Sequence, residues 1–420
     1  MSLRKQILSY SGVNIINASV PFLLLPILTE YLSPSDYGIL SLVQLLMALA
    51  FPILMNAQSL ITIEYSNLSI NKFKKLISSI LFFAFAGFIV LESGFYLLSD
   101  YIYEYFFLPD RLLLFIPVFL LFQVIPMLIP FIFQAKKQPF NFGKFKISLT
   151  IFNIGLSLFF VMYLNYGWEG RLWGIVGSFA VFNLIGLYLL MKIDLLSFNL
   201  DKDSIMQVFR YGIPLIPHMV GVFLISGSSR FFLADIMGVK EVGIFAVAFQ
   251  VSGSIFIIMN AINLAWSPYL FESLNKNPTM DIKLKLIKQT YQILIFMIIV
   301  VLVFLVLCPF IFYVFIDDSY HSGILLSRIL AFGFLFQGFY FMFTNYIFYS
   351  KKTKYLSFIT LFSSFIVVIS NFFLISSVGI LGAAYAVVIS YIVLCLIVAY
   401  FANKLVPMPW FLVLKNIYKK

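Results

Sequence analysis

One arginine stands out among the side chains that could do chemistry within the apolar runs of this chain. Arg230 lies inside such a run, with Ser226 and Ser229 in adjacent helical turns. Ionisable groups are costly in hydrocarbon, so they are functional candidates by default. A guanidinium at this depth can bind a phosphate through paired hydrogen bonds. Two other interpretations stay open: Arg230 extends to the outer headgroups, or it pairs with Asp235 about one turn away.

Three further titratable side chains are candidates. Glu92 lies less than two turns from the expected outer end of its run, where it either binds a coupling cation or pairs with a local partner. Asp235 is a second candidate for cation coupling. His218 either lines a polar cavity or has a structural role, which is the commoner use of a lone histidine in a helix.

Two stripes of polar side chains follow helical spacing and therefore each lie on one helix face. The first stripe comprises Tyr10, Asn14, Asn17 and Pro21, and the second comprises Asn260, Asn263 and Ser267. Such faces can line a wet cavity with amide donors and acceptors. They can equally join neighbouring helices, because Asn and Ser hydrogen-bond across helices in membranes.

Prolines recur in the runs that carry the first stripe and Arg230. Pro21 and Pro26 lie in the first, and Pro214 and Pro217 lie in the second. Proline removes an amide donor and clashes with the preceding turn, so both helices are expected to bend. These bends form either a gate or an adaptation to packing.

The elements that must position these residues are helices that cross a membrane. Hydrophobic residues make up 62% of the 420 residues and charged residues only 11%, with a mean hydropathy of +1.03. A soluble protein carries about 25% charged residues. A spanning helix needs about 20 apolar residues. Twelve runs satisfy this: Ile7–Leu28, Tyr37–Ile61, Leu76–Leu98, Leu112–Gln134, Ile147–Tyr166, Leu172–Met191, Ile213–Ile236, Val242–Leu270, Thr290–Ile316, Ile324–Tyr349, Leu356–Ser376 and Ile380–Ala402.

The basic residues predict the orientation of these helices. If both termini are cytoplasmic, most of the 28 basic residues fall in cytoplasmic segments. The outside then holds four basic residues: Arg111, Arg171, Lys240 and Arg328. Such a bias is the positive-inside rule. The net charge of +11 is therefore mainly an orientation signal, and nucleic acid is excluded as a partner.

An internal repeat divides the chain into two halves. The link Glu30–Ile39 aligns without gaps with Asp235–Ile244, so that Gly38 meets Gly243. The repeat predicts an all-α membrane protein with two six-helix lobes, residues 1–200 and 201–402, followed by a basic cytoplasmic tail, 403–420. Because each lobe has an even number of helices, a pseudo-twofold axis along the membrane normal should relate them. Two such lobes suit transport by alternating access.

Several segments together resemble the Wzx-type polysaccharide or O-antigen repeat-unit flippases of the multidrug/oligosaccharidyl-lipid/polysaccharide (MOP) superfamily. Most lie in the second half, and the Leu28–Leu42 region is similar to the family's N-terminal pattern. The segments are Tyr211–Pro217, Gly243–Ala248, Ala265–Tyr269, Tyr349–Thr353 and Gly379–Ala384.

The resemblance implies a function and its partners. It implies that the chain translocates undecaprenyl-diphosphate-linked oligosaccharide across the bacterial cytoplasmic membrane, with membrane lipids and a polymerase of the same pathway as further partners. The family often has an Asp-Arg pair late in the seventh helix. Here Arg230 matches the arginine, whereas Ser229 replaces the aspartate. An anionic diphosphate cannot cross hydrocarbon unaided, so a cationic, wet cavity is expected.

Two other function classes remain as alternatives. The first is a cation-coupled exporter of drugs or other small molecules from the same superfamily. The second is an enzyme, a membrane glycan polymerase or ligase, which would require a large outer loop, and Ser99–Arg111 is short. No nucleotide-binding loop or metal-ligand spacing occurs, so no cofactor, metal or catalytic residue is predicted.

Overall fold

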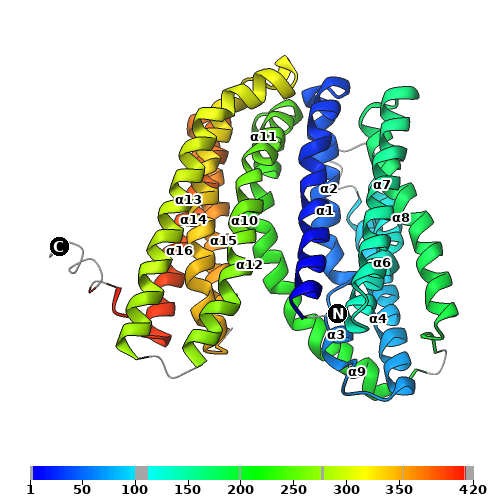
Figure 1. Cartoon of the computed structure of the whole chain (residues 1–420). Coiled ribbons are helices and arrows are strands. Elements are labelled where there is room, and N and C mark those ends of the chain that lie inside the picture. The colour runs from blue at the N-terminus through cyan, green and yellow to red at the C-terminus, as the bar shows by residue number, and fades with distance from the viewer. Residues whose placement is uncertain are drawn as a thin grey trace. The chain divides into compact units, whose positions relative to one another are not determined.

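The computed structural model of the chain describes residues 3–99, 112–197, 200–275, 279–352, 354–410 and 412; the side chains of residues 3–9, 112 and 113 are not described. Within these ranges the chain is nearly all helical and contains no strand. Twelve helical segments are long and apolar enough to cross a membrane. The expected class, an all-α multi-pass membrane protein with twelve spans, is confirmed (Figure 1).

The helices group into two compact units. Unit 1 comprises residues Met1–Phe223 and Gly238–Gly243, and unit 2 comprises Leu224–Met237 and Ile244–Lys420. Residues 201–223 therefore pack within unit 1, whereas the repeat alone divides the chain at residue 200. The two lobes and their symmetry axis stay a prediction of the repeat.

Unit 1 contains the helices that carry the first polar stripe. They are α1 (Leu3–Tyr31), α2 (Pro34–Leu54), α3 (Leu60–Glu64), α4 (Ile70–Leu97), α6 (Leu112–Ala135), α7 (Pro139–Leu158) with a π-helical end (Phe159–Tyr163), α8 (Gly167–Lys192), α9 (Lys202–Gly212) and the first turns of α10 (Ile216–Ile236). Helix α7 packs against both α1 and α8, and α4 packs against α6 and α9.

Unit 2 contains the rest of α10 and the helices that follow it. These are α11 (Val239–Ser252), α12 (Ser254–Asn275), α13 (Met280–Phe315), a 3₁₀ turn (Asp318–Tyr320), α14 (Gly323–Tyr349), α15 (Lys354–Val378) and α16 (Ile380–Leu405). The first residues of α11 belong to unit 1. Helix α16 packs against both α14 and α15, and these three helices form the core of the unit.

The start of α2 is determined by local chemistry in the repeated link. Ser33 caps the helix: its hydroxyl accepts from the amide of Asp36 at 3.2 Å, and the Asp36 carboxylate accepts from the amide of Ser33 at 3.2 Å. This is a capping box, and Pro34 occupies the first helical position, where no amide donor is needed. The cap places Gly38 on the second turn of α2.

The two glycines aligned by the repeat face each other across a close helix crossing. A Cβ atom on Gly38 would overlap the carbonyl oxygen of Val239, and one on Gly243 would overlap that of Pro34. The contacts are reciprocal, because Pro34 aligns with Val239 just as Gly38 aligns with Gly243. Reciprocal contacts of this kind are what a local twofold relation produces. Only glycine allows the two backbones to approach this closely.

The prolines affect their helices differently. Helix α1 continues without interruption through Pro21 and Pro26. Around Pro214 the chain instead forms a 3₁₀ turn, Ile213–Leu215, which separates α9 from α10, and Pro217 lies in the first turn of α10. The expected distortion is therefore present in the seventh span as a break between two helices, whereas in the first span the prolines lie within one helix.

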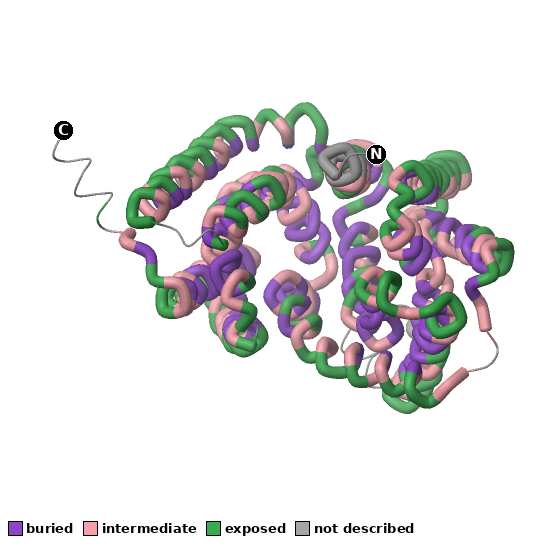
Figure 2. Tube along the Cα trace, turned by 60° about the horizontal axis from the view of Figure 1, so that its bottom comes forward, coloured by how far each residue is buried: buried purple, intermediate pink, exposed green. Residues whose placement is uncertain are grey.

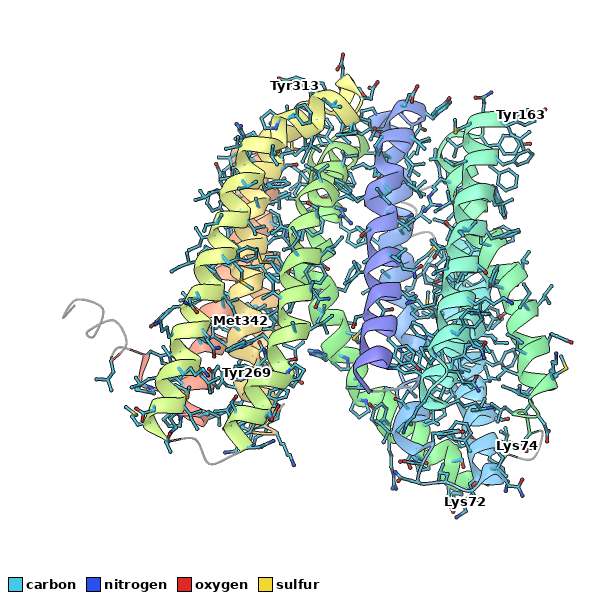
Figure 3. All side chains as sticks on the ribbon, viewed as in Figure 1. Lys72, Lys74, Tyr163, Tyr269, Tyr313 and Met342 are labelled. Carbon is cyan, nitrogen blue, oxygen red and sulfur yellow. The ribbon has the colours of Figure 1, made fainter. Side chains whose placement is uncertain are left out.

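The surfaces of the two units suit a bilayer. Exposed residues lie along the outward sides of the helices, and buried residues lie inside each unit (Figure 2). Helix α13 exposes large apolar side chains, including Leu302, Val306 and Phe310. In unit 1, Lys72 and Lys74 lie at one end and Tyr163 lies at the other (Figure 3). Apolar flanks with basic and aromatic ends are typical of membrane-spanning bundles.

Candidate functional site

Four polar side chains form a stripe along one face of α7 in unit 1. Lys146, Thr150, Asn153 and Ser157 follow at spacings of four, three and four residues, so they share a helix face. At a rise of about 1.5 Å per residue, the stripe is about 16 Å long, and Lys146 lies about 10 Å along the helix from Pro139. The stripe therefore occupies much of the depth of the hydrocarbon layer.

The first half of this stripe binds the amide residues predicted on α1. Lys146 Nζ donates to Asn14 Oδ1 at 2.8 Å, and Thr150 Oγ1 donates to Asn17 Oδ1. Asn17 also donates to the carbonyl oxygen of Val13 at 2.8 Å. The two asparagines therefore join α1 to α7, as expected for polar contacts between membrane helices. Asn14 is exposed and Lys146 is only partly buried, so this end of the stripe remains accessible.

Aromatic rings flank the same end of the stripe. The rings of Tyr10 and Phe142 meet edge to face with centroids 4.9 Å apart. Lys146 Nζ lies 5.4 Å from the Phe142 ring centroid, within range of a cation–π interaction. Phe142 is buried. The ammonium group is thus oriented by one ring and one amide oxygen.

The second half of the stripe binds an arginine from α8. Arg171 Nη1 donates to Asn153 Oδ1 at 2.7 Å and to Ser157 Oγ at 2.5 Å. The approach of α8 to α7 depends on Gly174, because a Cβ atom there would collide with Ser157. Ser157 is fully buried, whereas Arg171 is partly buried. These hydrogen bonds therefore hold the guanidinium against α7, and its remaining N–H groups can donate to a ligand.

The two cations at this stripe, Lys146 within it and Arg171 from α8, share one electrostatic property. Within the part of the chain that the structure describes, the ion pairs are Lys74–Asp194, Lys75–Asp201 and His321–Asp318, and none includes Lys146 or Arg171. Their hydrogen-bond partners are neutral amide and hydroxyl oxygens. A cation in a membrane without a carboxylate partner attracts an anion from elsewhere. The stripe is therefore suited to an anionic ligand.

A cavity of about 390 Å³ lies among other helices of unit 1. Gln44 of α2 and Gln123 of α6 supply its amides, and Phe51 and Phe179 supply aromatic surface. Both glutamines lie near the middle of their helices. Amide groups and aromatic faces are suited to a polar ring with hydroxyl groups, and membrane transporters commonly place substrate sites near the midplane.

Arg230 lies in unit 2, close to both an aromatic ring and buried polar side chains. Its guanidinium carbon lies 5.0 Å from the ring centroid of Phe249 on α11. Next to it, Ser229 is buried, and Ser228 accepts a hydrogen bond of 3.1 Å from the fully buried Asn371 of α15. The serine turns predicted as a polar face therefore pack partly against α15. The structure shows a cation–π contact for Arg230, and its role toward a phosphate stays a prediction.

The other predicted residues are dispersed. Glu92 on α4 has a buried Oε2 without a hydrogen-bond partner among the described residues, so local pairing is not seen there. His218 Nδ1 in unit 1 is likewise buried and has no partner among them. Asp235 is exposed near the end of α10. The expected outer loop Ser99–Arg111 lies outside the described residues from position 100 onward.

The second stripe, on α12, is partly used for packing. Asn263 Oδ1 accepts a hydrogen bond of 2.9 Å from Asn345 Nδ2 on α14. Asn260 and Ser267 are partly buried on the same helix. The alternative of interhelical contact is therefore observed for Asn263. The cavity role predicted for Asn260 stays a prediction.

Lys146 and Arg171 lie within helices, whereas the apolar runs predict loops at both positions. The fifth run begins at Ile147 and the sixth at Leu172, directly after the two cations. The structure begins α7 at Pro139 and α8 at Gly167. The spacing from Lys146 to Ser157 was a usable signal, because it matches a helix face in the same way as the stripe on α1.

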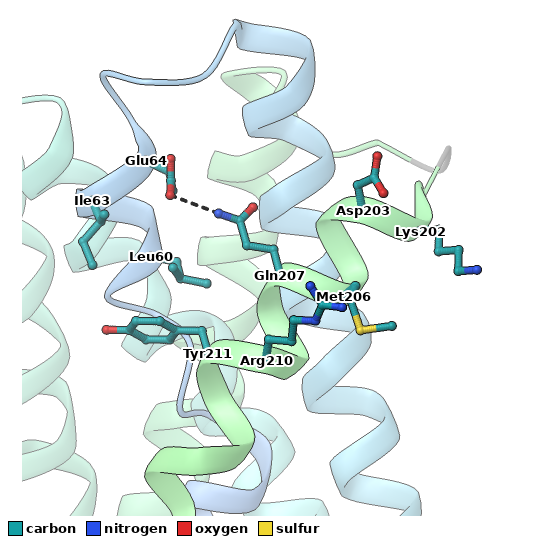
Figure 4. Close-up of a pocket in the computed structure, with 9 residues that line it drawn as sticks. All are labelled: Leu60, Ile63, Glu64, Lys202, Asp203, Met206, Gln207, Arg210 and Tyr211. Carbon is teal, nitrogen blue, oxygen red and sulfur yellow. Dashed lines mark hydrogen bonds between the residues drawn. The ribbon is translucent and has the colours of Figure 1, made fainter. Parts of the chain in front are cut away.

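A further cavity, of about 840 Å³, lies outside the stripe at the end of unit 1 that carries α3 and α9 (Figure 4). Gln207 donates to Glu64 at 3.0 Å across it. Tyr211 and Ser59 hydroxyls are 2.8 Å apart, and Asn56 donates to the carbonyl oxygen of Gly212 at 3.1 Å. These bonds dock the amphipathic α9 onto unit 1.

Comparison with known proteins gives two family matches. A family model described as polysaccharide biosynthesis protein matches residues 3–274, well over half of the chain. A second model, MatE, matches residues 214–373. No functionally curated protein matches the chain. The first match covers the N-terminal part, whereas the resemblance noted in the sequence lay mainly in the second half.

Solved structures with the same fold cover almost the whole chain. An inward-facing multidrug resistance MATE family transporter of the MOP superfamily has a TM-score of 0.70 at 14% identity, covering 99% of this chain and 96% of the other. An outward-facing conformation of such a transporter has a TM-score of 0.61 at 16% identity, covering 99% and 97%. A eukaryotic MATE transporter has a TM-score of 0.57 at 14% identity, covering 98% and 97%. At these identities the likeness shows the fold. The suspected family relationship is confirmed: the chain belongs to the polysaccharide biosynthesis protein family.

Proposed function

We propose that this protein is a flippase that moves undecaprenyl-diphosphate-linked oligosaccharide across the bacterial cytoplasmic membrane by alternating access. The observation that carries the proposal is the stripe on α7: Lys146 within it and Arg171 bonded to it lie in candidate membrane spans, and their partners among the described residues are neutral. A diphosphate needs cations along its path, because a bare anion in hydrocarbon is strongly disfavoured. The family match to polysaccharide biosynthesis supports the same substrate class.

The two cations have different geometries and therefore different expected roles. Lys146 is a point charge at the accessible end, and its single amide partner leaves two N–H donors for a phosphate oxygen. Arg171 is a rigid fork held by Asn153 and Ser157, so it presents a fixed edge to an anion. Successive contacts along one face lower the barrier for a diphosphate moving through the hydrocarbon layer.

The remaining parts of the proposal concern the sugar and the membrane. Gln44 and Gln123 with the aromatic wall of their cavity are candidates for contacts to the saccharide. Both termini are placed in the cytoplasm, because most basic residues then lie inside. Asn14 and Asn17 contact the stripe and remain candidates for the same pathway. Arg230 and Asn260 remain candidates for substrate contact, and the prolines of the first and seventh spans for gating. A polymerase that receives the flipped repeat unit is the expected partner.

The test uses cells in which this protein supplies repeat-unit export. Lys146→Met and Arg171→Met should each cause lipid-linked repeat units to accumulate on the inner leaflet, with export lowered at least tenfold. Arg171→Lys keeps the charge and should retain part of the activity. Arg328→Met is the matched control, because Arg328 is also a partly buried arginine in a span, bonded at 3.2 Å to the carbonyl oxygen of Leu305, but lies in unit 2.

Two results would contradict the proposal. Normal export by both methionine variants, at equal protein levels, would remove the stripe from the pathway. An equal loss in Arg328→Met would show that export responds to any missing arginine rather than to the stripe. Arg230→Ala and Arg230→Lys belong in the same set, since full export by both would remove Arg230.

A second candidate function is cation-coupled export of a small molecule. It is favoured by the MatE match over residues 214–373 and by the partnerless carboxylate oxygen of Glu92 among the described residues. A resistance screen with a panel of toxic cations separates the two. Resistance that is lost in Glu92→Gln, without any accumulation of lipid-linked saccharide, would favour the exporter.

A further inference from the structure

We infer that unit 1 binds an anionic phospholipid of the inner leaflet in a groove between α7 and α8. The groove has a volume of about 590 Å³ and lies at the ends of the two helices. Its lining includes Lys144 and Asn141 from α7, and Lys192, Leu189 and Phe182 from α8. This volume is within the range of roughly 300–1,000 Å³ that ligand sites in proteins occupy.

The groove is amphipathic in the direction that a lipid requires. Lys192 is the last residue of α8, and Lys144 lies in the second turn of α7. Both lysines and Asn141 are exposed, so they form a polar rim. Phe145 and Phe182 are each 6% exposed and meet edge to face at 5.4 Å, and they form an apolar floor toward the middle of the helices. A headgroup fits the rim, and acyl chains fit the floor.

The charge of the groove selects an anion. Its lining includes two lysines and no acidic residue. The nearest acid along the chain, Asp194, is bonded to Lys74 of α4 and is thereby engaged. Lys192 Nζ lies 5.9 Å from the ring centroid of Tyr188, which holds its side chain along the rim. Basic pockets between membrane helices at the cytoplasmic side bind phosphate-bearing headgroups.

The same bond to Lys74 places the groove at the end of unit 1 that carries Lys72 and Lys74 (Figure 3). By the positive-inside rule this end faces the cytoplasm. The site is distinct from the proposed pathway, because Lys144 and Lys146 lie two residues apart on α7 and therefore point to different helix faces. The occupant is inferred to be a resident phospholipid such as phosphatidylglycerol rather than the transported lipid.

The experiment measures lipid binding by the purified full chain in detergent. The unfolding midpoint is recorded while dioleoyl phosphatidylglycerol or dioleoyl phosphatidylcholine is titrated, because a ligand that binds only the folded state raises the midpoint. Phosphatidylglycerol should stabilise the protein at lower concentration than phosphatidylcholine. In Lys144→Gln/Lys192→Gln the phosphatidylglycerol affinity should fall about 30-fold, at about fivefold for each charge removed.

Two further variants test whether the lipid affinity depends on this groove or only on the net charge of the protein. Lys285→Gln/Lys288→Gln removes two exposed lysines from α13 and is expected to leave the affinity within about twofold. Ser148→Trp keeps the charge and fills the groove, since Ser148 is exposed and lines it, so it should abolish the preference for phosphatidylglycerol. Both variants should retain the midpoint of the lipid-free protein.

Several results would overturn the inference. Unchanged phosphatidylglycerol affinity in the double glutamine variant or in Ser148→Trp would exclude this groove. Equal stabilisation by phosphatidylcholine, or by inorganic phosphate alone, would show that an anionic lipid is not what binds. Displacement of phosphatidylglycerol by lower concentrations of undecaprenyl phosphate would assign the groove to the carrier lipid. Normal export by Lys146→Met and Arg171→Met, with intact phosphatidylglycerol binding, would contradict the proposed function only.

Discussion

The close crossing of Gly38 and Gly243 predicts a specific pattern of stability changes. Each glycine lies against a backbone carbonyl of the other helix, and a backbone atom cannot rotate away as a side chain can. Alanine at either position must therefore push α2 and α11 apart locally. Overpacking of a close contact costs about 1–3 kcal/mol. The gain in helix propensity from Gly to Ala, about 1 kcal/mol, offsets part of this cost.

The expected net loss is thus about 1–2 kcal/mol for Gly38→Ala and a similar amount for Gly243→Ala. The double variant is the sharper test. Because both Cβ atoms demand the same separation of the two helices, the first substitution already makes room for the second. The double variant should therefore lose less than the sum of the single variants, with a coupling of about 1 kcal/mol.

The assay is equilibrium unfolding of the purified protein in mixed micelles, with the fraction unfolded measured against denaturing detergent. Gly155→Ala on α7 is the matched control, because a Cβ atom there meets nothing within 4 Å. It should be neutral or stabilising by up to about 1 kcal/mol. If the two single losses add within about 0.3 kcal/mol in the double variant, or if neither variant is destabilised, the reciprocal crossing is refuted.

Three other predictions concern stability and local order. Gly379→Ala should lose about 1–3 kcal/mol in the same unfolding assay, because Gly379 has φ +64° and ψ −144°, which side chains rarely adopt; an unchanged stability would contradict the cap geometry of α16. A double-mutant cycle of Ser228→Ala with Asn371→Ala should give a coupling of about 0.6–1.7 kcal/mol, since these residues bond at 3.1 Å inside unit 2, and additive losses would show that the bond contributes nothing. Asn56→Ala should speed amide hydrogen exchange in α9 relative to α4, because it removes the bond to Gly212. If α9 exchanges equally fast in the variant and in the unsubstituted protein, α9 is held by other contacts.

Much of the architecture was predictable because the bilayer imposes it. Hydrocarbon excludes unpaired backbone groups, so each long apolar run had to be a helix, and all twelve runs overlap the observed spans. The alignment of Gly38 with Gly243 also predicted a structural equivalence, and the reciprocal contacts of the two glycines agree with it. Likewise, the spacing of Tyr10, Asn14 and Asn17 predicted a common face on α1, and two of these residues bind one neighbouring helix.

The functional site was less predictable, because it depends on which helices become neighbours. Hydropathy predicts loops at Lys146 and Arg171, because it places the end of a span only to within a few residues and a charged residue near an end shifts the predicted boundary inward. The environment of Arg230 was equally undecided until packing brought Phe249 within 5.0 Å of its guanidinium.

The helical structure, the twelve candidate membrane spans and the repeated link were predictable from the sequence alone, because they follow from local hydropathy and chain order. That α7 packs against both α1 and α8 depends on the tertiary structure, and this packing joins five short polar side chains to Lys146 and Arg171: Asn14, Asn17, Thr150, Asn153 and Ser157. Hydropathy depends on the local sequence of one helix. A polar site instead requires side chains from several helices to meet at hydrogen-bond distance.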